Sequence, residues 1–316
     1  MKVIDHIIVG LDLSTMDGYL LEYAAFISNK LGADKISFLH VTPTFSVFDE
    51  LEDDWTEEEI PDSLEEIIKE ELSDRVQKYF HPKSKTSIEQ QVVVLEGDTT
   101  EQFIRYAVTS NADLLLLGKK SGLKGAGLIL KQVISLSPCS VMLASELAPH
   151  SIDNIMLPLN FSSNSILAYE RAEMLSKYFG ANYFMQFVNT EVTLTSLLKT
   201  KIYTFSEKEK EAFKGSVEKE AKAKYKKFLK KIGKTEDEMT DIKFTVNTDG
   251  DPAYTIYRYA IKRKADLILL GAGIRSSYSN LFLDSISEKL AAYDSTIPVY
   301  IVKNKERNLK NIHDLF

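Results

Sequence analysis

The sequence predicts an α/β protein with two doubly wound parallel-sheet domains in tandem. Three observations predict this fold class: the chain length, the alternation of short apolar runs with helical patterns, and the repetition of the same landmarks in both halves. The chain has 316 residues, enough for two domains of about 100–200 residues each. Short apolar runs are typical of strands buried on both faces of a parallel sheet, and the helices between them cover those faces.

The opening elements of the two halves match in order and in spacing. The first half is expected to form a strand at 7–11, a helix at 17–31 and a strand at 36–41, and the second half repeats this order at 155–159, 165–179 and 183–188. Gly32 and Gly180 follow the two helical patterns, where a glycine commonly ends a helix. We interpret this agreement as an internal duplication.

The later landmarks of the two halves also correspond. A Gly-Asp pair precedes a helical pattern at 97–99 and at 250–252. An apolar strand that ends on a glycine follows at 112–118 and at 265–271. A short last strand lies at 141–143 and at 299–301. Each half therefore reads β-α-β-α-β-α-β-α-β, and right-handed crossovers make such a sheet doubly wound. We expect domain one at 1–147, domain two at 150–305 and a C-terminal tail at 306–316. Ligands of such sheets bind at the carboxyl ends of the strands, where the strand order switches.

A long polar segment follows the second strand of each half. The first, at 49–80, is acidic and leads into a helix whose expected apolar face is Leu64, Ile67, Ile68, Leu72 and Val76. The second, at 206–234, is rich in lysine and carries Tyr225 and Phe228, which we expect to pack. Two interpretations stay open: a pair of charged surfaces that bind partners, or two solvated helix faces. Trp55, in the acidic segment, is either a partner anchor or a cover for the edge of the core.

The composition bounds the class of protein. A net charge of −7 argues against a general binder of nucleic acid, which needs a basic surface, so no nucleic-acid partner is expected. The single cysteine, Cys139, reads as a small buried core residue, and no metal-binding motif is present in the sequence. The N-terminus lacks the features of a signal peptide, and no apolar run is long enough to cross a bilayer. A cytoplasmic protein without a membrane partner is the expectation.

The landmarks resemble the universal stress protein (UspA-like) family in its tandem two-domain form. The resemblance rests on segments that recur in order and cover nearly the whole chain twice: Asp12-Leu13-Ser14, His40-Val41, Gly97-Asp98-Thr99, Gly118, 138–141, 285–290 and Pro298-Val299. It implies a Rossmann-like fold of the adenine nucleotide alpha hydrolase type and a role in the stress response. It also implies that the last strands, 141–144 and 299–302, pair within the chain. The two domains would then form a pseudo-dimer, which also covers two exposed sheet edges.

One branch of this family binds ATP, and the resemblance carries its site onto the first half. There Asp12 ends the first strand, Val41 lies where the family places adenine, and Gly118 opens a glycine loop with Gly122, Gly125 and Gly127. Glycines and a helix N-terminus present backbone N–H groups to phosphate oxygens. The loop departs from the family pattern, because it is shorter, Ser121 replaces a glycine, and Leu128 replaces the hydroxyl residue. ATP or AMP is the expected ligand of this half, with Lys119, Lys120 or Lys124 as the source of positive charge.

The second half keeps the loop length and loses the glycines. Its equivalent positions are Asn160, Val188, Gly271 and Ser285. Ile274 and Asp284 stand in two glycine positions, and a carboxylate at the phosphate helix repels an anion. We expect a degenerate site.

These residues also have purely structural interpretations. Asp12 and Ser14 are suited to capping the following helix, the glycines are suited to tight turns, and His40 reads as a packed strand residue. Our first hypothesis is a non-enzymatic stress-response protein that binds an adenine nucleotide in the first domain. The alternative is a nucleotide-independent interaction or regulatory module, with a homodimer or unidentified proteins as partners. An enzyme ranks last, because the sequence offers no Ser-His-Asp arrangement and no P-loop.

Overall fold

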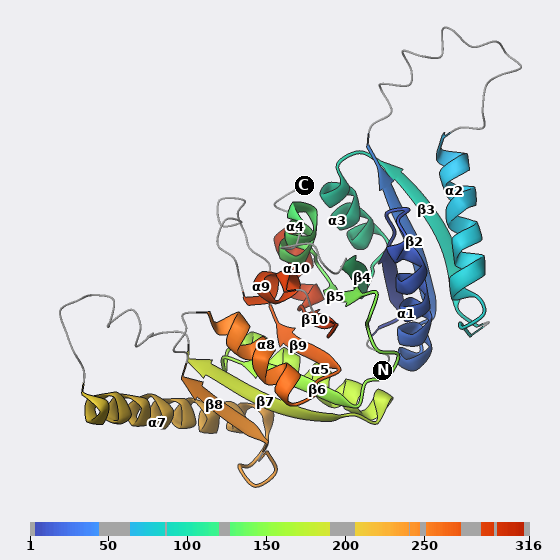
Figure 1. Ribbon diagram of the computed structural model, residues 1–316. Coiled ribbons are helices and arrows are strands. Elements are labelled where there is room, and N and C mark those ends of the chain that lie inside the picture. The colour runs from blue at the N-terminus through green and yellow to red at the C-terminus, as the bar shows by residue number, and fades with distance from the viewer. Residues whose placement is uncertain are drawn as a thin grey trace, which may run out of the picture.

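The computed structural model describes residues 4–43, 64–85, 87–119, 127–189, 206–239, 241–246, 251–272, 286–293 and 296–312. Along this part of the chain, strands and helices alternate in two equivalent sets (Figure 1). Each set has the predicted order, and the predicted fold class of two doubly wound α/β domains is confirmed.

The elements of the first repeat are strands β1 (His6–Gly10), β2 (Lys35–Thr42), β3 (Glu89–Glu96), β4 (Leu114–Lys119) and β5 (Ser140–Ser145), with helices α1 (Met16–Leu31), α2 (Leu64–Arg75, extended by a π-helical turn at Val76–Phe80), α3 (Thr99–Thr109) and α4 (Leu128–Leu136). Those of the second repeat are strands β6 (Asn154–Leu159), β7 (Asn182–Asn189), β8 (Ile242–Val246), β9 (Leu267–Gly271) and β10 (Val299–Val302), with helices α5 (Ser163–Phe179), α7 (Glu207–Ile232), α8 (Pro252–Lys262), α9 (Ile286–Ala292) and α10 (Lys305–Ile312).

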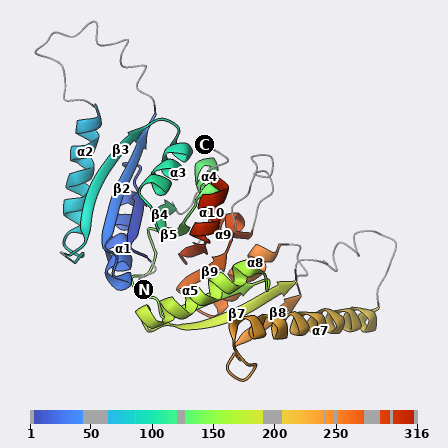
Figure 2. The ribbon, with the colours of Figure 1, turned by 180° about the vertical axis from the view of Figure 1, so that it is seen from behind.

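The strands form one ten-stranded sheet in the order β3-β2-β1-β4-β5-β10-β9-β6-β7-β8. Neighbouring strands within each repeat run parallel, and the repeats join where β5 and β10 pair antiparallel, with Met142 opposite Tyr300. The predicted pairing of the two last strands within the chain is confirmed. Helices α2 and α7 consequently lie at opposite ends of the molecule (Figure 2).

The duplication extends to single hydrogen bonds. Asp113 Oδ2 accepts the N–H groups of the residue before β1 and of the first residue of β1, at 2.9 and 3.1 Å. Asp266 Oδ2 does the same at the start of β6, at 2.9 Å each. Asp98 caps α3 and Asp251 caps α8 through their side chains. Such local agreement is expected when two copies of one sequence form the same strands and helix caps.

Two apolar layers cover the sheet, and each continues through both repeats. Helices α1, α2, α5 and α7 bury their apolar residues on one face, and α3, α4, α8 and α9 bury theirs on the other. At the junction α1 and α5 pack together, with the rings of Phe26 and Phe179 5.8 Å apart and His150 stacked on Phe26. Because apolar burial is continuous across the junction, we expect the repeats to stabilise each other.

The buried residues predicted for the two polar segments are only partly confirmed. Ile68, Leu72 and Val76 of α2 and its π-helical extension are buried, but Leu64 and Ile67 are 38 % and 43 % exposed, so that part of the prediction was wrong. Ile67 lies about 100° around the helix from Ile68, and Leu64 lies in the first turn. In the second segment, Tyr225 and Phe228 are buried as expected. Trp55 lies outside the described residues.

Cys139 is fully buried before β5, as predicted. Burial raises the pKa of its thiol to about 11, which keeps it protonated and unreactive at neutral pH. Among the described residues, no helix is both long and apolar enough to cross a membrane.

Candidate functional site

A cavity of about 490 Å³ opens at the carboxyl ends of β1, β2 and β4 in the first repeat. The strand order switches here, because β1 continues to β2 on one side and pairs with β4 on the other. Its volume lies within the roughly 300–1,000 Å³ of small-molecule sites. It brings together four of the predicted binding residues, Asp12, Val41, Gly118 and Gly127.

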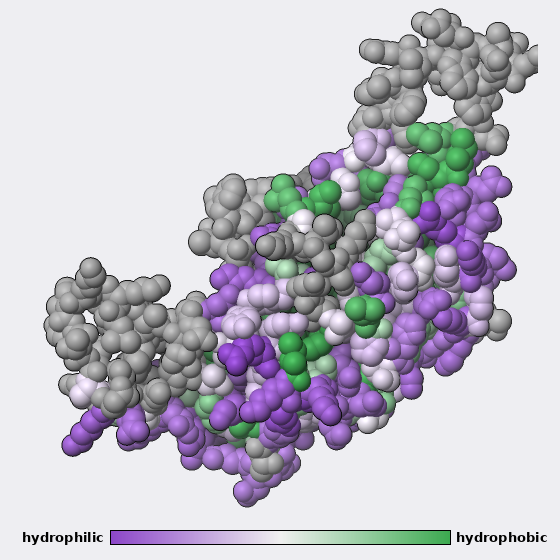
Figure 3. Space-filling model, in the orientation of Figure 1, coloured by the Kyte–Doolittle hydropathy of each residue, from purple (hydrophilic) through white to green (hydrophobic). Residues whose placement is uncertain are grey.

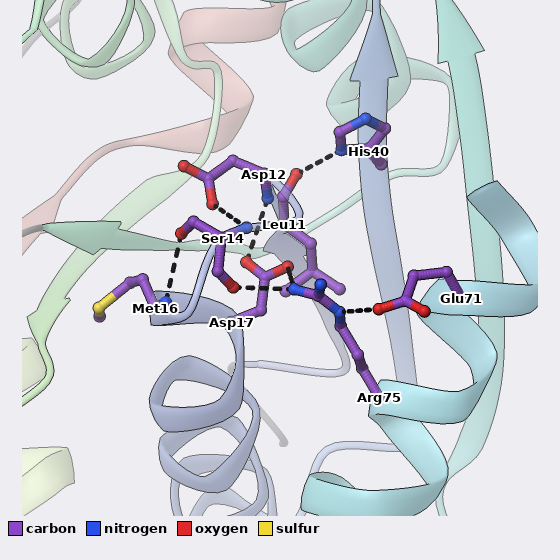
Figure 4. Close-up of polar contacts among 8 residues, drawn as sticks. All are labelled: Leu11, Asp12, Ser14, Met16, Asp17, His40, Glu71 and Arg75. Carbon is purple, nitrogen blue, oxygen red and sulfur yellow. Dashed lines mark hydrogen bonds and ion pairs between the residues drawn. The ribbon is translucent and has the colours of Figure 1, made fainter.

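Asp12 belongs to a tight turn between β1 and α1. Leu13 has a positive φ of 61°, and Ser14 N–H donates to Asp12 Oδ1 at 3.1 Å (Figure 4). The Ser14 hydroxyl accepts the N–H of Met16 at 3.2 Å and so caps α1. The capping interpretation therefore holds for Ser14, whereas the Asp12 carboxylate accepts a hydrogen bond from the backbone of the turn itself. Asp12 remains exposed on the rim of the cavity.

An ion pair between the buried Asp17 and the half-buried Arg75 holds this turn. Asp17 Oδ1 accepts the N–H of Asp12 at 3.1 Å, and Asp17 Oδ2 lies 3.1 Å from Arg75 Nη1. Arg75 also donates to the Ser14 carbonyl at 2.8 Å and to Glu71 at 2.7 Å. Burial, the largest effect, raises the pKa of Asp17, while the Asp12 N–H and Arg75 oppose it. The sequence does not predict this pair, because its members lie 58 residues apart and share no motif.

His40 ties the ends of two strands together. Its Nδ1 lies 2.9 Å from the Leu11 carbonyl, which only accepts, so Nδ1 is the donor of this hydrogen bond. His40 is thus a packed strand residue, as expected, and it also lines the cavity beside Val41. Val41 itself is 9 % exposed, enough for an apolar contact with a ligand.

The two glycines at this cavity have different surroundings. A Cβ on Gly118 would lie 2.9 Å from Met16 Cγ, so this glycine admits the first turn of α1. A Cβ on Gly127 would meet nothing within 4 Å, and Gly127 precedes α4 at the cavity wall. Lys119, 9 % exposed, also lines the cavity and brings a positive charge. Gly122 and Gly125 lie outside the described residues.

The second repeat has a cavity of about 240 Å³ at the equivalent place. Asn160, Val188 and Gly271 line it, whereas Ser285 lies outside the described residues. Asn160 repeats the turn of Asp12, because its Oδ1 accepts from Ser162 N–H at 3.1 Å and from the Ser165 hydroxyl at 2.8 Å. A Cβ on Gly271 would lie 1.9 Å from the Asn164 carbonyl oxygen, so α5 rests directly on this glycine.

The charges of the first cavity have no equivalents in the second. Asn160 stands in the place of Asp12, Ser165 in that of Asp17, and Ala272 in that of Lys119. The described residues that line the second cavity include no charged side chain. In neither repeat do the described residues form a group of three or more metal-ligating side chains.

Comparisons with known proteins agree with this architecture. A universal stress protein from Archaeoglobus fulgidus DSM 4304 superposes with a TM-score of 0.62 at 19 % identity, over 95 % of this chain and 98 % of that one. A functionally unknown protein from Pseudomonas aeruginosa PAO1 superposes with a TM-score of 0.60 at 13 % identity, over 99 % and 97 %. No curated protein sequence matches the chain.

The family relationship comes from the sequence itself. The model of the universal stress protein family matches the chain twice, over residues 4–145 and 151–303. These two matches coincide with the two repeats of the sheet and together span most of the chain. The chain therefore belongs to the universal stress protein family, as a tandem two-domain member.

Proposed function

We propose that this chain is a non-enzymatic stress-response protein that binds an adenine nucleotide, ATP or AMP, in its first repeat. One observation carries the proposal: the cavity at the strand switch point brings together Asp12, Val41 and Gly127, which lie far apart in the sequence. Ligands of doubly wound sheets bind at this place. A cytoplasmic location belongs to the same proposal.

The described residues fit the parts of such a ligand. Val41, Leu117 and Val133 supply apolar surface for a base, and the Asp12 carboxylate at the rim can accept hydrogen bonds from ribose hydroxyls. Gly127 leaves open space before the N-terminus of α4, where backbone N–H groups favour an anion. Lys119 would offset phosphate charge. The ion pair of Asp17 and Arg75 would hold the Asp12 turn in place.

The second repeat lacks this set of groups. Its cavity is half the size, and no charged side chain lines it among the described residues. A nucleotide phosphate brought there would lose its water without gaining a cation from the described residues. We therefore expect one nucleotide per chain.

Titration calorimetry with ATP and AMP at up to millimolar ligand tests the proposal. We expect one site per chain, at least tenfold weaker binding in Asp12→Ala, and unchanged binding in the matched second-repeat variant Asn160→Ala. Asp12→Asn is the finer control, because it keeps the acceptor of Ser14 N–H and removes only the charge. Absence of binding heat would remove the proposal, and phosphate release from ATP on the timescale of minutes would contradict the non-enzymatic part.

A second candidate function is a nucleotide-independent interaction or regulatory module. The exposed lysines of α7 favour it: Lys222, Lys226, Lys227, Lys230 and Lys231. On the face that Figure 3 shows, the coloured residues at this end of the molecule are mainly hydrophilic. Glu218 and Glu236 pair with two of these lysines and leave most of the positive charge for an acidic partner. Deletion of residues 49–62, or replacement of the α7 lysines by glutamine, should then remove partners in a pull-down, and an unchanged set of partners would exclude this function.

A further inference from the structure

Gln186 of β7 carries a buried polar atom that the fold itself does not use. The residue is 2 % exposed and lines the cavity of the second repeat. Its Nε2 donates to Thr245 Oγ1 at 2.9 Å, but its Oε1 has no hydrogen-bond partner within the part of the chain that the structure describes. Buried acceptors are nearly always paired in native proteins, so this one calls for an explanation.

The first repeat indicates that packing does not require a glutamine here. Leu39 occupies the equivalent position of β2. It pairs with Gly10, two residues before the turn residue Asp12. Gln186 likewise pairs with Pro158, two residues before the turn residue Asn160. Leu39 is fully buried in the apolar layer on that face. An apolar side chain therefore suits this site in the fold, and the amide of Gln186 adds a polar function.

The other residues of this cavity define what it can hold. Asn160, Ser165 and Gln186 contribute neutral polar groups, while Val188, Ile256 and Leu270 form apolar walls. The volume of about 240 Å³ is half that of the cavity in the first repeat. Such a site favours a small, uncharged ligand that has apolar faces and hydrogen-bonding edges.

We propose that the cavity of the second repeat binds an uncharged heterocycle, a nucleobase without phosphate, through the amide of Gln186. The Oε1 atom accepts an N–H from the ligand, and the second hydrogen on Nε2 is available to an acceptor beside it. Side-chain amides pair with adenine in this two-point manner. Phosphate is disfavoured, because the described residues around the cavity provide no cation. This site differs in place and in ligand chemistry from the nucleotide site proposed for the first repeat.

Nuclear magnetic resonance of the whole chain, labelled with ¹⁵N at its glutamine side-chain amides, tests the proposal. The Gln186 signal is assigned by its loss in Gln186→Leu, which copies the residue of the first repeat. Free adenine should shift this signal saturably, and AMP should do so at least tenfold more weakly. No shift at the solubility limit of adenine, or equal affinity for AMP, would overturn the proposal.

The stability of Gln186→Leu separates a binding role from a structural one. Because the substitution removes an unpaired buried acceptor, its melting temperature should equal or exceed that of the parent chain. A fall of several degrees would show that Gln186 serves the fold and would overturn the proposal. Asp12→Ala is the matched control, since it should weaken ATP binding in the first repeat at least tenfold and leave the adenine shift of Gln186 intact. The two proposed sites can therefore fail separately.

Discussion

Gly271 lies so close to Asn164 that a Cβ on the glycine would stand 1.9 Å from the asparagine carbonyl oxygen. The first turn of α5 therefore rests on the end of β9 without room for any side chain. The first repeat repeats this arrangement less tightly, since a Cβ on Gly118 would meet the flexible side chain of Met16. Close packing thus explains why a glycine occupies each of these two positions, whereas no described residue packs closely against Gly127.

We predict a graded response to alanine at these glycines. Gly271→Ala should lower the free energy of unfolding by about 3 kcal/mol, because backbone must move. Gly118→Ala should cost about 1 kcal/mol, because Met16 can shift. Gly127→Ala should be neutral or stabilising by up to about 1 kcal/mol, since its φ of −55° suits alanine. Urea unfolding measures all three, and an equal loss in each would contradict the packing assignment.

Arg75→Gln should weaken both the fold and nucleotide binding in the first repeat. Asp17, whose side chain is only 2 % exposed, would lose its cationic partner, which we expect to cost about 1–3 kcal/mol. The Asp12 turn would lose its anchor to α2, so ATP should bind several-fold more weakly. Calorimetry measures the affinity for ATP, and urea unfolding measures the free energy of unfolding.

Glu71→Gln is the matched control for this variant. It removes the exposed Glu71–Arg75 pair and leaves the contact between Arg75 and Asp17 in place. Its unfolding free energy should change by less than about 0.5 kcal/mol, as is usual for surface pairs along a helix. A larger effect in Glu71→Gln than in Arg75→Gln would refute the role given to Asp17.

Lys303 makes the junction between the repeats sensitive to pH. It follows β10, is buried, and donates from Nζ to the carbonyls of Ser135 and Ser137 at the end of α4, at 3.1 and 3.0 Å. Burial lowers the pKa of Lys303 to about 7, although Cys139 and Glu288 oppose the shift. Above this pKa the unfolded chain binds more protons at this residue than the folded chain, so its contribution to stability rises with pH up to its ordinary pKa.

The variant Lys303→Met isolates this contribution. The unfolding free energy of the parent chain minus that of the variant should increase between pH 7 and pH 9, by at most about 1.4 kcal/mol per pH unit. Denaturant unfolding at fixed ionic strength measures both proteins, and the subtraction cancels the titration of other groups. A difference that stays flat or falls over this range would contradict the lowered pKa.

Removal of the second repeat should convert the intrachain pairing into an intermolecular one. In the whole chain β5 pairs with β10, and Val141, Met142 and Leu143 are at most 2 % exposed. A fragment of residues 1–147 would leave this apolar edge open, and open edges recruit another strand. We expect the fragment to dimerise in light-scattering measurements. A folded fragment that stays monomeric at micromolar concentration would argue against β5 as a pairing edge.

The sequence predicts those features that depend on local pattern. Apolar runs, helix stops at Gly32 and Gly180, and the repeated landmarks predict the elements and their order. The sequence predicts the meeting of β5 with β10 only through its resemblance to the family. It did not predict that Leu64 and Ile67 are exposed, since helical spacing alone does not show how far a helix reaches beyond its sheet.

Contacts between residues that are far apart in the sequence could not be predicted either. Asp17 and Arg75 meet because α1 packs against the π-helical extension of α2, and Lys303 reaches Ser135 across the junction of the repeats. The role proposed for Gln186 is inferred from the burial of its side chain among its neighbours. The sequence does not show this burial, because a glutamine within a strand pattern gives no signal of its own. Comparison of Leu39 with Gln186 in the aligned repeats would have drawn attention to it.

We propose that the two repeats have become unequal, with a nucleotide site in the first alone. A crystal structure of the whole chain grown with millimolar ATP tests this inequality. We expect density for one nucleotide per chain, beside Asp12, Val41 and Gly127, and none for phosphate beside Asn160 and Gly271. A nucleotide seated in the second repeat, or in neither, would contradict it.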